Sequence, residues 1–189
     1  MLMGEFWLPS ENLQMNRLMD INTDKNNTKE LVFNQIEAEL KKENFTVVKK
    51  DNSRPWGGFF VIDEGQAAVF AAKYFPHLEM DSIKITNKLS PKILVVAPNK
   101  RLSWQYHFRR AEIWKIVAGI VGVKTSLTDE EGDVQSLVPG DFIQMDKGER
   151  HRLIGLDSWG IVAEIWQHTD PENPSDEEDI VRLQDDFGR

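Results

Sequence analysis

From residue 83 onward the chain alternates short β-prone runs with turns about every ten residues. The turns fall where Pro, Gly, Asn and Asp gather, at residues 98–99, 129–132, 139–140 and 147–148. Short strands separated regularly by such turns are typical of a β-sandwich or a barrel. We predict eight strands, about the number in a jelly roll, at residues 92–96, 102–106, 112–117, 119–125, 134–138, 141–144, 151–154 and 159–166.

The first part of the chain has a different pattern. Residues 29–43 repeat apolar side chains at helical spacing, and Thr28 can cap the start of this helix. We interpret residues 1–28 as a loosely ordered lead-in or a short helix. Two short strands and an alanine-rich helix are predicted at residues 45–48, 59–62 and 66–74.

With 189 residues the chain suits one packed domain with an appendage and is too short for two full domains. We therefore expect an N-terminal helical extension at residues 1–50, followed at residues 51–189 by a mainly β jelly-roll domain with an acidic C-terminal tail. On composition alone, the acidic run from Asp170 to Asp186 is interpreted as a loop-like or mobile solvated face.

Composition excludes several classes of function. No apolar run approaches the roughly 18 residues that would span a bilayer, and the opening residues lack the basic region of a secretion signal. The absence of cysteine excludes disulfides and thiol chemistry, so a reducing cytoplasm is the expected location. A net charge of −8 argues against nucleic acid as a partner. We therefore expect a small molecule as the partner, with no membrane involved.

One strand and the turn after it carry residues of the types that bind transition metals. In a strand, Gln105 and His107 would point to the same side, and a turn at residues 108–111 would bring Glu112 alongside them. His151 stands in a second strand–turn–strand element, just after a glycine. Two imidazoles, a carboxylate and an amide oxygen predict a site for one divalent metal ion, with positions left open for water or substrate.

At this point the sequence resembles the cupins, proteins with a double-stranded β-helix (jelly roll) fold. Their first motif is G(X)5HXH(X)3-4E(X)6G and their second is G(X)5PXG(X)2H(X)3N. His107, Glu112 and Gly119 match the first at the required spacing, and Gly140, Gly148 and His151 match the second. The departures from the two motifs are Asn99, Gln105, Asp146 and Gly155, which replace Gly, His, Pro and Asn.

Within the cupins the chain is more similar to the type II mannose-6-phosphate isomerase (phosphomannose isomerase) domain, over roughly residues 52–189. The similarity lies in the segments Arg54–Pro–Trp–Gly57, Leu102–Ser–Trp–Gln–Tyr–His107, Arg110–Ala–Glu–Ile–Trp114, Gly148–Glu–Arg–His–Arg152, Glu178–Asp–Ile–Val–Arg182 and Phe187–Gly–Arg189. That family also has glutamine at the position of Gln105. Where it usually has further histidines, this chain has Phe108 and Arg109, so we expect any drift in substrate to arise there.

The resemblance implies a metal-dependent isomerisation of mannose 6-phosphate to fructose 6-phosphate, the work of an intramolecular oxidoreductase in carbohydrate metabolism. It implies an essential arginine at Arg110 and the return of Arg182 to the site from the tail. The catalytic base is open between Glu164 and Glu112. Zn²⁺ is the first choice of metal, and Fe²⁺, Ni²⁺ and Mn²⁺ are alternatives because ligand type does not separate them.

Candidate substrate-binding residues lie near both motifs. Arg54 and Trp56 stand in a turn-rich loop that could bring a guanidinium and backbone amides to an anion. Arg110 and Arg152 are preferred as ligands for phosphate because each flanks a residue of the metal motif. The other basic residues near the motifs are Lys100, Arg101, Arg109, Lys147 and Arg150, some of which we expect to pair with neighbouring acids.

Two other classes of function remain open in the sequence. One is another cupin enzyme, such as an epimerase or an oxygenase, and the other is a non-catalytic sugar-phosphate-binding cupin, including one that has lost its metal. His77 and His168 lack partners at ligand spacing and are interpreted as exposed histidines. A homodimer is expected because the exposed edges of jelly rolls commonly pair.

Overall fold

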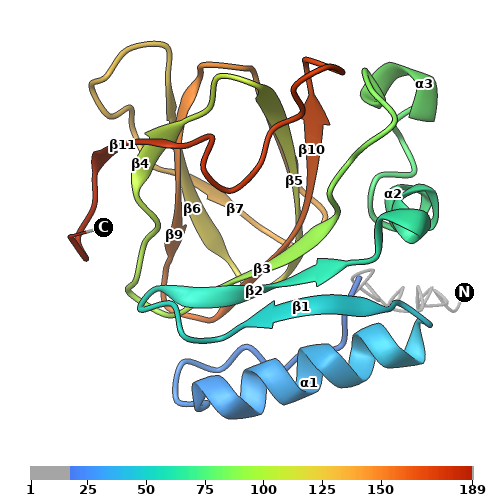
Figure 1. The fold of residues 1–189 in the computed structure, drawn as a ribbon. Coiled ribbons are helices and arrows are strands. Elements are labelled where there is room, and N and C mark those ends of the chain that lie inside the picture. The colour runs from blue at the N-terminus through green and yellow to red at the C-terminus, as the bar shows by residue number, and fades with distance from the viewer. Residues whose placement is uncertain (1–17, 189) are drawn as a thin grey trace, which may run out of the picture.

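The computed structural model describes residues 18–188 and contains two antiparallel β-sheets that face each other (Figure 1). The six-stranded sheet has the order β1-β2-β3-β10-β5-β8, and the five-stranded sheet has the order β11-β4-β9-β6-β7. The strands are β1 (Val47–Asp51), β2 (Gly57–Ile62), β3 (Lys92–Val96), β4 (Trp104–Tyr106), β5 (Arg110–Ala118), β6 (Val121–Ser126), β7 (Gln135–Leu137), β8 (Phe142–Met145), β9 (Arg150–Gly155), β10 (Gly160–His168) and β11 (Val181–Gln184).

The central strands of the six-stranded sheet are buried on both faces, so their sequences are almost continuously apolar. One face packs against the helices and includes Ile93, Ile113 and Ile165. The other face looks into the space between the sheets and includes Leu94 and Val162. Alternation along each strand therefore sends every second side chain of β3, β5 and β10 into the barrel interior.

Three α-helices and one 3-10 turn (Glu64–Gln66) cover the outer face of this sheet: α1 (Lys29–Lys42), α2 (Ala67–Tyr74) and α3 (Met80–Ile83). Thr28 caps α1 by accepting a hydrogen bond from the amide of Leu31. The buried stripe of α1 carries Phe33, whose ring lies 5.2 Å from that of Phe60 on β2. Figure 1 shows α1 lying along β1 and β2, which joins the N-terminal region to the barrel.

The helices and strands of the structure are largely those predicted from the sequence. The fold is mainly β with an N-terminal helix, as predicted, and the eight strands expected after residue 91 are all present, with ends shifted by one or two residues. Helix α3 was not predicted and lies just before the strand-rich region, which was expected to begin at residue 83. Of the predicted lead-in, residues 1–17 lie outside the described residues, and residues 18–28 contain no helix.

The boundary expected at residue 50 falls inside β1, which pairs with β2 along its length. The apolar core under the six-stranded sheet also continues from α1 into the barrel strands. Residues 29–51 thus pack as part of the same body as the barrel. Among residues 18–188, no helix is long and apolar enough to cross a membrane.

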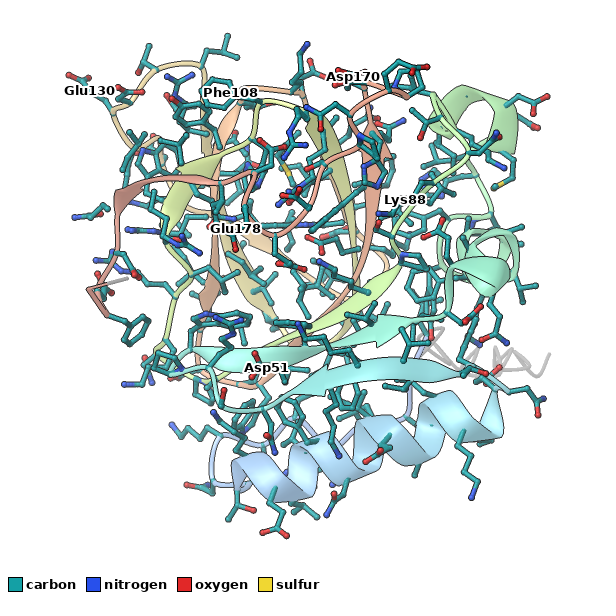
Figure 2. The ribbon with its side chains drawn as sticks, viewed as in Figure 1. Asp51, Lys88, Phe108, Glu130, Asp170 and Glu178 are labelled. Carbon is teal, nitrogen blue, oxygen red and sulfur yellow. The ribbon has the colours of Figure 1, made fainter. Side chains whose placement is uncertain are left out.

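The acidic C-terminal tail lies against the barrel. After β10 it crosses in front of the barrel interior and then forms β11, which pairs with β4 at the edge of the five-stranded sheet (Figure 1). Ser175 and Asp179 are buried in this segment, and Glu178 lies on it in front of the barrel (Figure 2). Most carboxylates of this segment are exposed, as expected for a solvated face, but the segment is anchored, because the Asp179 carboxylate accepts hydrogen bonds from the amides of Phe108 and Arg109 in the turn that precedes β5.

Candidate metal centre and its cavity

Three residues that could hold a metal ion come together at one end of the barrel. His151 on β9 and Gln105 on β4 are cross-strand partners. The turn at residues 107–109 separates β4 from β5, so that Glu112 on β5 reaches His107 as the sequence spacing required. One ligand atom from each of His107, Glu112 and His151 lies within 4.8 Å of the others, and all three side chains are buried.

The two imidazoles flank the Glu112 carboxylate. His107 Nε2 lies 3.1 Å from Oε1 of Glu112, and His151 Nε2 lies 3.3 Å from Oε2. The other ring nitrogen of each histidine faces a backbone carbonyl, that of Asp179 at 2.5 Å from His107 and that of Glu149 at 3.0 Å from His151. A carbonyl only accepts, so each Nδ1 carries the proton and each Nε2 keeps a lone pair close to the carboxylate.

This arrangement leaves two buried atoms without a hydrogen bond, Oε2 of Glu112 and Nε2 of His151. Both are acceptors, and two lone pairs facing each other in a buried site are unfavourable unless a cation or a hydrogen-bond donor lies between them. Backbone carbonyls that fix the histidine tautomers are the usual outer support of a metal site. The donor set therefore fits a divalent ion such as Zn²⁺.

Electrostatics favour the same protonation states. Burial lowers the pKa of His107, which keeps that imidazole neutral. Burial would raise the pKa of Glu112, but the attraction of the His107 ring in its charged form and of the permanently charged Arg110 guanidinium outweighs burial and holds that pKa well below its ordinary value. Neutral imidazoles and an ionised carboxylate are the forms that bind metal.

Gln105 is the fourth predicted ligand. Its side chain is buried beside His151, and its Oε1 accepts a hydrogen bond of 2.6 Å from the Ser103 hydroxyl. A carbonyl oxygen has a second lone pair, so this bond leaves Oε1 able to bind an ion or a substrate hydroxyl. Gln105 also contributes to the wall of the adjoining cavity.

The cavity beside the three residues has a volume of about 220 Å³. This is smaller than the roughly 300–1,000 Å³ of sites for drug-sized ligands, which suits a small polar molecule. Its walls are mixed, with aromatic rings, acids and bases facing inward. The charged and aromatic lining residues are Arg54, Trp56, Phe59, Lys92, Arg110, Glu112, Trp114, Glu164, Trp166, Glu177, Glu178 and Arg182.

Glu164 lies on β10 directly opposite Trp114 on β5 and accepts a 2.9 Å hydrogen bond from its indole. Burial, reinforced by the negative charge of Glu112, raises the pKa of Glu164 to about 8. Lys92 and Arg110 oppose this effect without cancelling it. The cavity thus contains two carboxyl groups in different states, one ionised and one largely protonated at neutral pH.

Arg110 joins the metal centre to the cavity. Its Nε donates to Oε1 of Glu112 at 2.7 Å, and one terminal nitrogen lies 3.1 Å from Nε2 of His107. The guanidinium stacks 3.6 Å from the centre of the Trp166 ring. Its other terminal nitrogen donates to the Ser175 hydroxyl and to the carbonyl of Asp176 in the tail.

The tail also supports His107, a role that sequence reasoning missed. The carboxylate of Asp179 accepts from the amides of Phe108 and Arg109, both at 3.0 Å, while its carbonyl fixes His107. Arg109 donates to tail atoms, and Phe108 is 62% exposed. The two positions where the family usually has histidines thus face the tail or solvent. The Asp179 role had no local signal, since it depends on a contact 71 residues away in sequence.

His168 was predicted to be exposed and is fully buried. Its Nδ1 accepts from the amide of Ser175 and its Nε2 lies 3.0 Å from the Ser90 hydroxyl. The prediction was wrong because β10 continues through His168, where alternation turns the side chain inward. By contrast, His77 stays near the surface and contacts the Phe142 ring.

Three of the four predicted substrate-binding residues line the cavity, and one does not. Arg54, Trp56 and Arg182 line the cavity, and Arg182 arrives there because β11 sets it opposite Gln105. Arg152 is not among the lining residues. It follows His151 directly, so alternation sends it to the other face of β9, where its guanidinium binds Glu131 and Gln184.

Comparison with known proteins places this geometry in a family. Residues 66–185, more than half of the chain, match the model of the family described as "Mannose-6-phosphate isomerase C-terminal". The chain belongs to this family. As a mannose-6-phosphate isomerase C-terminal domain it carries the cupin fold, in agreement with the two facing sheets and the two predicted motifs.

Among curated proteins, this domain is 31% identical over 61% of its length to a mannose-1-phosphate guanylyltransferase of Salmonella montevideo. It is 27% identical over 84% of its length to a mannose-1-phosphate guanylyltransferase of Escherichia coli strain K12. The chain spans about a quarter of these relatives, 23% and 27% of their lengths.

Solved structures with a similar fold include KdgF from a Halomonas species, at 14% identity and a TM-score of 0.48, covering 69% of this chain and 89% of that one. A cupin 2 conserved barrel protein from Salinispora arenicola aligns over 41% of this chain and 61% of its own, at 22% identity and a TM-score of 0.36.

Proposed function

We propose that this protein is a metal-dependent sugar-phosphate aldose–ketose isomerase that interconverts mannose 6-phosphate and fructose 6-phosphate. The observation that carries the proposal is the shared position of Glu112, which belongs both to the three-residue metal cluster and to the wall of a small charged cavity. The family description supports the reaction, and the relatives' names support a mannose phosphate as the ligand.

In this proposal His107, Glu112 and His151, with Gln105 beside them, hold one divalent ion, for which Zn²⁺ is the first choice. When bound, the ion supplies positive charge against the oxygens at C1 and C2 of the sugar, where negative charge develops during the reaction.

Glu164 moves the proton. The reaction takes a proton from C2 of the aldose and returns one to C1, with the matching transfer between the two oxygens. A carboxyl group whose pKa is about 8 can accept a proton at one carbon and return it at the next near neutral pH. The Trp114 indole holds this carboxyl in place.

Arg110 would stabilise the negative charge that develops on the oxygen atoms of the substrate. Its guanidinium is fixed by Glu112, Trp166 and the tail, and it borders both the metal cluster and the cavity. A planar cation in a buried site stabilises an oxyanion more strongly than it would in water. The aromatic rings of Trp56 and Trp166 in the cavity wall would limit the entry of water from their side during the transfer.

One observation favours a second candidate, a metal-free sugar-phosphate-binding domain. The Arg110 guanidinium already supplies positive charge to Glu112 and to His107, at 2.7 Å and 3.1 Å. In such a domain the cavity would bind the same ligand without turnover, and added metal would change neither its affinity nor its stability.

The test is incubation of the full chain with mannose 6-phosphate in D₂O, followed by proton NMR. We expect fructose 6-phosphate carrying deuterium at C1, since a carboxyl group exchanges its proton with solvent. Glu164→Gln keeps the shape of the protonated side chain and its bond from Trp114, so the variant should fold and bind metal but lose turnover. Turnover in the variant equal to that of the wild type would remove Glu164 from the mechanism, and absence of turnover in both would leave the binding domain.

A further inference from the structure

Lys92 holds a position that the sequence did not single out. It begins β3, and its side chain lies across from Glu164 on the interior face of the six-stranded sheet. Its relative exposure is only 5%, and it is the one lysine among the buried residues in the part of the chain that the structure describes. The ammonium lies 3.4 Å from the centre of the Trp166 ring and borders the cavity.

The partner of this ammonium is a carboxylate from the tail. Oε1 of Glu177 lies 2.5 Å from Nζ of Lys92. The two side chains differ sharply in exposure, 6% for Lys92 and 56% for Glu177. A buried, fixed cation is therefore covered by a carboxylate that reaches it from the solvent side of the cavity.

Positive charge surrounds this contact. Lys49 and Arg54 lie 5.7 Å and 5.6 Å from the centre of the Phe59 ring, which Lys92 also approaches at 5.7 Å. Burial would raise the pKa of Glu177, but Lys92, Arg110 and Lys49 outweigh it and lower that pKa. The local field thus favours an anion where the Glu177 carboxylate lies.

We propose that the Lys92 ammonium binds the phosphate group of the substrate, and that Glu177 occupies this anion site in the empty protein as a displaceable internal competitor. The proposal rests on the proposed function for the identity of the ligand. It adds a binding residue and an autoinhibitory contact to that site.

The Glu177 side chain can leave the anion site while the backbone of the tail stays in place. The backbone on either side of it is anchored by the buried residues Ser175 and Asp179, whose side chains bond to each other and to Arg110 or the turn amides. Rotation of one exposed side chain would return the Glu177 carboxylate to water. Lys92 remains fixed by the Trp166 ring and by its own burial.

The experiment measures binding of inorganic phosphate to the full chain by isothermal titration calorimetry, at constant ionic strength set with chloride. Removing the competitor in Glu177→Gln should tighten binding about two- to fivefold, the range expected for a partly exposed ion pair. The matched control is Glu172→Gln, which removes the same charge from an exposed position of the same tail outside the cavity and should leave affinity unchanged.

Lys92→Met keeps the apolar stem over Trp166 and should weaken phosphate binding at least tenfold, while Lys92→Arg should restore most of it. Thermal unfolding monitored by circular dichroism shows whether the two Lys92 variants fold, and Glu177→Gln tests the proposal even if they do not. In steady-state kinetics, Glu177→Gln should lower the KM for mannose 6-phosphate and leave kcat unchanged.

Equal phosphate affinity in wild type, Glu177→Gln and Glu172→Gln would overturn the proposal, as would undetectable phosphate binding in all of them. Turnover with an unchanged KM in Glu177→Gln would overturn it while the proposed function stands. The predicted order of phosphate affinities without any turnover would support the anion site and contradict the isomerase.

Discussion

Acidification should loosen the tail by protonating His168. In the folded protein this buried imidazole accepts a hydrogen bond from the Ser175 amide, so it must be neutral at Nδ1. Burial lowers the pKa of His168 to about 4, and the nearby cations Lys88, Arg110 and Lys92 act in the same direction. A proton on Nδ1 would remove the bond that anchors the start of the tail.

The sign and size of the effect follow from the two pKa values. The folded value of about 4 lies below the ordinary value of 6.5, so the unfolded chain binds the proton more readily. The His168 contribution to stability is complete above about pH 6.5 and falls as the pH drops toward 4. At about 1.4 kcal/mol per pH unit, the loss over this window approaches roughly 3 kcal/mol.

Urea unfolding at pH 7, 5.5 and 4.5 measures this loss, but other groups also titrate there. The matched variant is His168→Asn, whose amide oxygen can accept from Ser175 and does not titrate. We expect the wild type to lose about 2–3 kcal/mol more than the variant between pH 7 and 4.5. An identical pH dependence in the two proteins would refute the assignment of a neutral, tail-anchoring histidine.

Three further changes have defined outcomes. His151→Ala should reduce bound zinc from about one ion per chain to near zero by elemental analysis, and full retention of zinc would exclude His151 as a ligand. Arg110→Lys keeps the positive charge but cannot hydrogen-bond to Glu112 and to the tail at the same time. Turnover should therefore fall at least tenfold, and hydrogen exchange of the backbone amides at residues 175–180 should become faster. Unchanged turnover and unchanged exchange would contradict the role of the guanidinium. Gly57→Ala should lower the free energy of unfolding, measured with urea, by at least about 2 kcal/mol. The reason is that φ of Gly57 is +143° and the new Cβ would lie 1.9 Å from the Val95 carbonyl oxygen. A decrease under about 0.5 kcal/mol would show that β2 and β3 can separate there.

Much of the fold was predictable because it depends on local patterns. Turn residues separate the strands in the sequence, and the nearly continuous apolar sequences of β3 and β10 indicate strands that are buried on both faces. The metal cluster was predictable for a related reason. His107 and Glu112 lie on either side of one short turn, so their spacing in sequence nearly fixes their distance in space.

The surroundings of that cluster were not predictable from the sequence alone. Asp179 and Glu177 acquire their roles from contacts across 70 or more residues, such as the 85 between Lys92 and Glu177, and His168 is buried partly by a contact 78 residues away with Ser90. In sequence the tail looked merely acidic and solvated. Its carboxylates are instead the counter-charges of Arg109 and Lys92. Arg152 was predicted to bind substrate because it is next to His151 in sequence. Neighbouring residues of a strand point to opposite faces, so Arg152 points away from the cavity.

The most direct test of the proposed isomerase is the metal content of the purified full chain, measured together with conversion of mannose 6-phosphate to fructose 6-phosphate on the same sample. We expect about one divalent ion per chain and turnover that a chelator abolishes and added zinc restores. Turnover that persists after complete removal of metal, or stoichiometric metal with no turnover of this sugar phosphate, would contradict the proposed metal-dependent isomerase.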